Sequence, residues 1–152
     1  LTRMALRWAE GKREEFLSIV RKGLLTTAAA FVVVAAVTYV IGAPLLTLVF
    51  GTDVSGYVGE LMVLVLAGAL NAAGVILYYA LATMRRLRAV LVAYAVAGGT
   101  AYLIAPMLTK SHAMMGASLA YAATMGLLAT LFVVFMLIPA PRATIETEPV
   151  ND

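Results

Sequence analysis

The chain of 152 residues contains no cysteine, and only 12% of its residues are charged. The absence of cysteine excludes a disulfide framework, a thiolate metal site and a cysteine nucleophile. The scarcity of charge restricts the protein further, because a soluble domain carries about 25% charged residues. With 63% hydrophobic residues, the chain lacks the side chains that a polar surface would need. Its composition therefore predicts a membrane protein.

Aspartate, glutamate, lysine and arginine are absent from four long stretches of the sequence. These stretches are residues 24–50, 61–84, 89–108 and 113–140. Each is long enough for a transmembrane helix, which needs about 20 apolar residues to cross a hydrocarbon core of ~30 Å. The strands of a membrane barrel would be about half as long and would alternate. We therefore expect an all-α, polytopic membrane bundle with four transmembrane helices in residues 24–140.

The basic residues outside these spans are unevenly distributed. Most of them lie in residues 1–23 and in a cluster that consists of Arg85, Arg86 and Arg88. The loops 51–60 and 109–112 hold one lysine between them. Because cytoplasmic loops carry an excess of lysine and arginine, we expect both termini and the cluster to be cytoplasmic. The three arginines are then topology anchors at the level of the lipid headgroups, and binding of a lipid phosphate is the alternative.

The two ends of the chain differ from the spans. Residues 1–23 interleave apolar and charged side chains on both sides of Gly11, which is typical of two short amphipathic helices in the cytoplasmic interface. A solvated connector is the alternative. Residues 141–152 have the prolines and polar residues of a disordered cytoplasmic tail. Because the chain begins with Leu1 in an already amphipathic segment, we expect it to be the C-terminal part of a longer protein.

Three residues within the spans are of particular interest. Pro44 is expected to kink the first span near its outer end, because proline removes a backbone donor. Asn71 lies near the middle of the second span, where an unpaired amide is costly. It can be satisfied by a hydrogen bond between helices or by a polar cavity, and both remain open. Tyr78 lies seven residues further on the same helical face, so Asn71 and Tyr78 are the candidates for a substrate cavity.

Few other residues suggest chemistry. His112 is the only histidine and has no second candidate ligand close to it in the sequence, so we expect no metal site. No serine–histidine–acid set and no glycine-rich phosphate loop is present. We therefore expect neither an enzyme nor a cofactor, and no nucleic-acid partner.

Several stretches resemble the C-terminal part of the polysaccharide and O-antigen flippases, which belong to the multidrug/oligosaccharidyl-lipid/polysaccharide exporter superfamily. The stretches are "MALRWAEGKREEFLSIVRKGLL", "GAPLLTLVFGTDVS", "LMVLVLAGALNAAGVILYYALATMRR" and "MMGASLAYAATMGLLATLFVV". The Gly116-Ala117 pair that opens the last span is also usual in that family. The resemblance covers nearly the whole chain, as a pattern of hydrophobic segments and a few small residues.

This resemblance implies two six-helix lobes with alternating access, in which the chain supplies the last four helices of the second lobe. It implies a bacterial inner-membrane protein that flips an undecaprenyl-diphosphate-linked oligosaccharide. The expected partners are the bilayer, the N-terminal part of the transporter and that lipid-linked substrate. No span carries a formal charge, so most of the substrate site is expected upstream of Leu1. The alternatives are a cation-coupled multidrug exporter of the same superfamily and a small four-helix scaffold subunit.

Overall fold

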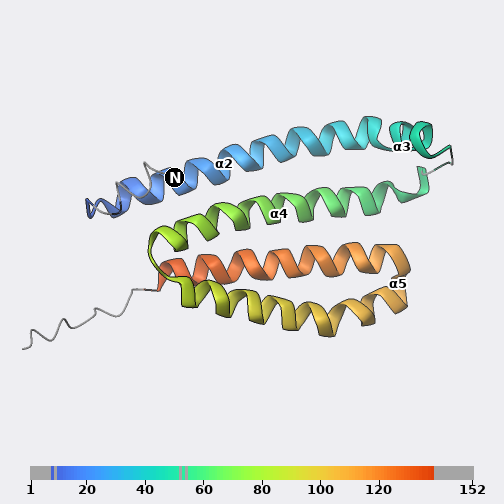
Figure 1. Ribbon diagram of the computed structural model, residues 1–152. Coiled ribbons are helices and arrows are strands. Elements are labelled where there is room, and N and C mark those ends of the chain that lie inside the picture. Colours follow the sequence, from blue (N-terminus) through green and yellow to red (C-terminus); the bar gives the residue numbers. More distant parts are fainter. Residues whose placement is uncertain (1–7, 9, 52, 54, 139–152) are drawn as a thin grey trace, which may run out of the picture.

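The computed structural model describes residue 8, residues 10–51, residue 53 and residues 55–138, and all regular structure in them is helical. The elements are α2 (Arg13–Val37), the π-helix η1 (Thr38–Gly42), α3 (Ala43–Phe50), the 3-10 turn η2 (Ser55–Tyr57), α4 (Val58–Thr83) and α5 (Leu87–Leu137). Three stretches are long and apolar enough to cross a membrane, namely Arg13–Phe50, Ser55–Thr83 and Leu87–Leu137. The expectation of an all-helical protein with membrane-spanning helices therefore agrees with the structure (Figure 1).

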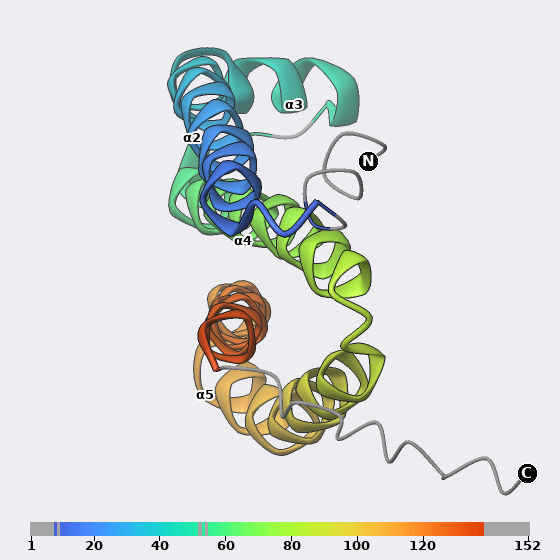
Figure 2. The same ribbon diagram turned by 90° about the vertical axis from the view of Figure 1, so that its left-hand side faces the viewer.

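α5 consists of two antiparallel arms. The backbone of Ala113 is non-helical, with φ 48° and ψ −122°, and the chain reverses direction there (Figures 1 and 2). The rings of Tyr94 in the first arm and Phe132 in the second lie 5.7 Å apart. The reversal coincides with the predicted start of the last span, but the loop predicted for residues 109–112 is helical. The hydroxyl of Ser111 donates to the carbonyl of Met107 at 3.0 Å, which satisfies this polar side chain within the helix.

The arms approach each other most closely just after their turn. A Cβ atom built on Gly116 would lie 1.9 Å from the carbonyl oxygen of Leu108, so only a hydrogen fits at this position. Gly116 and Ala120, four residues apart and expected from the sequence to permit close packing, are both buried. A small residue at position 116 therefore sets the separation of the two arms.

The first span is a continuous helix at its start and is interrupted before Pro44. Gly11 adopts φ 71°, and α2 then runs without a break from Arg13 into the apolar span. The second of the two predicted short helices is therefore the first turns of α2, while residues 1–7 lie outside the described part. At the far end, the wide turn η1 precedes Pro44, and α3 lies across the direction of α2 (Figure 2). A wide turn before a proline compensates for the missing backbone donor.

The buried side chains gather at the end of the molecule that holds the turn between α4 and α5. The fully buried large residues there are Phe16, Val20, Leu77, Leu81 and Phe132. α2 packs against α4 on the side away from α5. At the opposite end large apolar side chains are exposed, with Leu48 at 81% and Phe50 at 68%. The structure is tightly packed at one end and open at the other.

Replacing Gly116 by alanine should destabilise the protein by about 2–3 kcal/mol, because the new methyl group has to push two backbone segments apart. Gly98→Ala is the matched control in the same helix, since a Cβ there would meet nothing within 4 Å. We expect that control to be neutral or slightly stabilising. Thermal unfolding in detergent micelles measures both changes, and equal effects would contradict the assigned role of Gly116.

Candidate functional site

The turn that carries the arginine cluster is a Schellman motif. The N–H of Arg86 donates to the carbonyl of Leu81, and the N–H of Arg85 donates to the carbonyl of Ala82, both at 3.0 Å. Arg85 adopts φ 56°, the left-handed conformation that glycine usually supplies at this position. The turn therefore satisfies carbonyls at the end of α4 even though it contains no glycine.

Arg86 joins this turn to the end of the second arm. Its guanidinium donates to the carbonyl of Phe135 and to that of Ile138, the second at 2.5 Å. The last carbonyls of a helix have no partner within the helix, and a cation near them is favoured by the helix dipole. Arg86 therefore caps the C-terminal end of α5, which is a structural role that the sequence did not indicate.

The three arginines do not act as one group. Arg88 is exposed and makes no hydrogen bond or ion pair with the part of the chain that the structure describes. Arg85 is exposed as well, whereas Arg86 is half-buried and engaged. The anchoring role predicted for all three stays a prediction, and Arg88 and Arg85 are the two whose side chains are exposed and make no hydrogen bond or ion pair with the described residues.

Removal of the Arg86 side chain should lower the free energy of unfolding by about 1–2 kcal/mol, because two charge-assisted hydrogen bonds are lost at a partly exposed site. Arg88→Ala removes the same charge from the neighbouring turn and should change stability by less than about 0.5 kcal/mol. The comparison of Arg86→Ala with Arg88→Ala by thermal unfolding in detergent separates capping from net charge. A similar loss in both variants would speak against the cap.

Asn71 presents its amide to the outside of the described helices. Its side chain is exposed, and no described residue forms a hydrogen bond with it. The hydroxyls of Thr83, Thr100 and Thr124 instead donate to carbonyls four residues earlier in their own helices, which is a common way for threonine to be satisfied. Among the described residues, helix-to-helix hydrogen bonding of Asn71 is therefore not observed.

The two predicted cavity residues lie in different surroundings. Tyr78 is half-buried and packs against the apolar core, whereas Val75 and Tyr79 share the exposed side of α4 with Asn71. The rings of Tyr78 and Tyr79 form a T-shaped, edge-to-face contact with centroids 5.3 Å apart. Because exposure depends on how α2 and α5 flank α4, sequence spacing alone did not separate Tyr78 from Tyr79.

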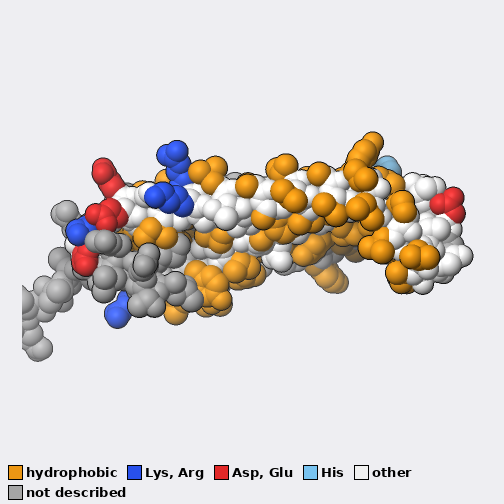
Figure 3. Space-filling view, turned by 90° about the horizontal axis from the view of Figure 1, so that it is seen from above, with side chains coloured by type: hydrophobic (Ala, Val, Ile, Leu, Met, Phe, Trp, Pro, Cys, Tyr) orange, Lys and Arg blue, Asp and Glu red, His pale blue; other side chains and the backbone are white. Residues whose placement is uncertain are grey.

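The opposite end of the molecule carries acidic residues. Asp53 precedes η2 and accepts a hydrogen bond from the backbone N–H of Ser55 at 2.9 Å, which lowers the pKa of Asp53. His112 lies near the turn between the arms, and its Nδ1 is 2.9 Å from the hydroxyl of Ser111. No group of three potential metal ligands occurs among residues 8, 10–51, 53 and 55–138. In Figure 3 the lysine and arginine side chains lie towards one end of the visible face, with acidic side chains alone at the other.

No protein-family model, curated protein or solved structure matches the chain.

The uneven charge predicts that the arginine turn is cytoplasmic and that the segment around Ser55 faces outward. The chain has no cysteine, so Ser55→Cys and Arg88→Cys each introduce a single reactive thiol. An impermeant thiol reagent applied to intact cells should label position 55 and leave position 88 unlabelled until the membrane is permeabilised. The reverse pattern would overturn the predicted orientation.

Proposed function

We propose that the chain is part of a membrane flippase that moves an undecaprenyl-diphosphate-linked oligosaccharide across the bacterial inner membrane. The proposal includes four membrane crossings, with the two arms of α5 counted separately. Both termini are then cytoplasmic, and these helices form part of the second lobe of an exporter. No chemical step is assigned to the chain, so in this proposal it is a transporter and not an enzyme.

The position of Asn71 is the observation that carries the proposal. It lies near the middle of α4, and its exposed amide has no hydrogen-bond partner among the described residues. A polar group at this depth that faces plain hydrocarbon would be costly. Polar residues inside a membrane are commonly found along substrate paths and water-filled cavities. A lipid-linked sugar needs such a path for its polar head while its tail stays in the bilayer.

The open arrangement of the helices is consistent with this role. The outer half of the first span and the first arm of α5 expose large apolar side chains, which a larger transporter can cover with its remaining helices. Within this proposal the side of α4 that holds Asn71 and Tyr79 lines the cavity. Tyr78 contributes to the packing of α4 and not to the cavity surface. The partners are the remaining helices of the transporter, the bilayer and the lipid-linked oligosaccharide.

The change Asn71→Leu in the complete transporter tests the proposal, because leucine has a similar size and needs no hydrogen-bond partner. We expect unchanged thermal stability in detergent and a large loss of glycan display at the cell surface. Leu66→Val is the matched control, since it alters the volume of an exposed residue of α4 that lies five positions before Asn71, about 140° away around the helix and so off the proposed cavity side. Its display should stay close to that of the unchanged protein.

Two results would contradict the proposal. If Asn71→Leu costs about 1 kcal/mol of stability, the size found for hydrogen bonds between membrane helices, and display per folded molecule is kept, Asn71 joins helices and does not line a cavity. If the complete transporter fails to restore display in cells that lack their own glycan flippase, the assigned substrate is wrong.

A further inference from the structure

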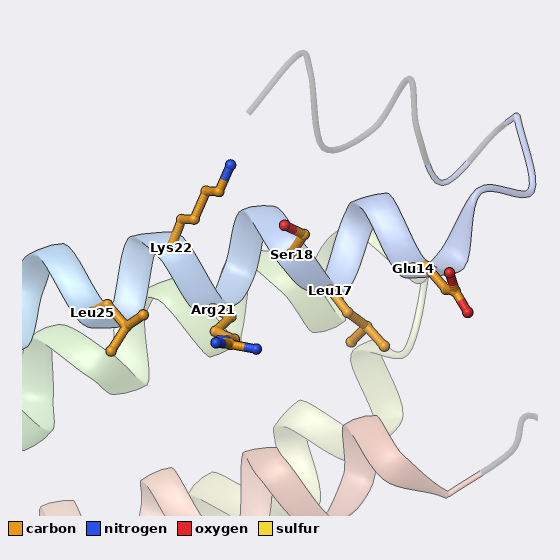
Figure 4. Close-up of a pocket in the computed structure, with 6 residues that line it drawn as sticks. All are labelled: Glu14, Leu17, Ser18, Arg21, Lys22 and Leu25. Carbon is orange, nitrogen blue, oxygen red and sulfur yellow. The ribbon is translucent and has the colours of Figure 1, made fainter.

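A groove of about 540 Å³ runs along one side of α2. It is lined by Glu14, Leu17, Ser18, Arg21, Lys22 and Leu25. Figure 4 shows Ser18 and Lys22 along one edge and Leu17, Arg21 and Leu25 along the other, with Glu14 at the end near the start of the helix. All six of these lining residues come from the same helix. Its surface combines two cations and a hydroxyl with two leucines.

The two cations of this groove have no counterion among the residues that the structure describes. Arg21 and Lys22 are exposed, and neither forms an ion pair with any residue in the described part of the chain. They are the last charged residues before the uncharged run of residues 23–50. Glu14 lies two turns away, at the other end of the groove, and leaves an excess of one positive charge.

The packing of α2 on α4 indicates how deep these cations lie. A Cβ on Gly23 would lie 3.7 Å from the side chain of Ile76, so these two positions are level. Arg86 follows Ile76 by ten positions along α4 and its turn, and Arg21 lies two positions from Gly23 in the same direction. Only the seven positions from Ile76 to Thr83 are helical, so at a rise of ~1.5 Å per residue Arg21 lies about 8 Å deeper than the end of α4 when the arginine turn is placed at the lipid headgroups. A cation at that depth needs an anionic or strongly polar partner.

A membrane phospholipid offers the matching chemistry. The side chains of arginine and lysine extend their charged ends towards the headgroup region while their stems stay along apolar surface. The phosphate of a lipid can descend to meet them, and its acyl chain then lies beside Leu17 and Leu25. Exposed cations next to a span attract anionic lipids by about 1 kcal/mol each in general. The groove adds the hydroxyl of Ser18 and two leucine side chains to that attraction.

We propose that this groove binds the phosphate group of an anionic membrane lipid. Arg21 and Lys22 donate to the phosphate oxygens from the two edges, the hydroxyl of Ser18 is a further donor, and Leu17 and Leu25 contact the acyl chain. The site lies on α2, apart from Asn71 and from the arginine turn. It concerns the lipid around the protein and does not depend on the proposed transport function.

The test uses the full chain in detergent micelles, titrated with phosphatidylglycerol or with phosphatidylcholine and observed by native mass spectrometry. We expect one phosphatidylglycerol molecule to bind in preference to phosphatidylcholine. The double variant Arg21→Gln/Lys22→Gln should lower its affinity roughly twenty- to thirtyfold, since each cation contributes on the order of fivefold. The control Arg13→Gln/Arg88→Gln makes the same change in net charge at exposed positions and should lower the affinity less than about twofold. Arg21→Lys keeps the charge and should keep most of the binding.

Several results would overturn the proposal. Equal losses of affinity in the two double variants would show that only the net charge of the protein matters. Equal binding of both lipids would show that an anionic headgroup is not required. Displacement of the lipid by inorganic phosphate at similar concentration would indicate a site for free phosphate. The helix content of each variant is checked by circular dichroism, and loss of binding by a folded Arg21→Lys variant would also contradict a site based on charge.

Discussion

The packing of the helices depends on one end of the molecule. There the hydrogen bonds from Arg86 to the carbonyls of Phe135 and Ile138 join the start of α5 to its end. Three helix termini meet there: the end of α4, the start of α5 and the end of its second arm. Backbone carbonyls at helix ends need partners, and one guanidinium supplies two of them. The buried apolar cluster surrounds this point, with Leu81 fully buried and Met136 nearly so. Polar capping and apolar packing therefore stabilise the same end.

The far end of the two arms depends on close backbone contact instead. Gly116 lies so near the carbonyl of Leu108 that no side chain fits, and this contact determines the distance between the arms at their turn. Between the two ends, small buried residues such as Ala93 and Ala97 let the arms stay close. Because lipid provides no hydrophobic drive between helices, close packing of small residues is the main attraction available. The large exposed side chains of α3 carry no penalty in lipid, and this end can stay open.

Composition alone predicted an all-helical fold, and the structure has three helical stretches that are long and apolar enough to cross a membrane. The chain reversal at Ala113 lies at the position from which the sequence predicted the last span, and the wide helical turn precedes Pro44, for which a kink was predicted. The role of Arg86 could not be predicted, since its partners lie 49 and 52 residues away along the chain. The left-handed backbone conformation of Arg85 could not be predicted from the sequence either, because glycine is the residue that normally indicates this conformation. The different surroundings of Tyr78 and Tyr79 depend on where α2 and α5 lie against α4. The spacing of residues along α4 carries no information about that placement.

The distribution of polar groups favours a larger assembly over an isolated bundle. No buried side-chain polar atom among the described residues lacks a hydrogen-bond partner, and the core is almost entirely apolar. Asn71, near the middle of α4, is nevertheless exposed on the outside of these helices. In a membrane protein the polar residues of the spans normally face the interior of the bundle or a water-filled cavity. We therefore propose that the exposed side of α4 is an inner surface, which additional helices or a second chain would enclose.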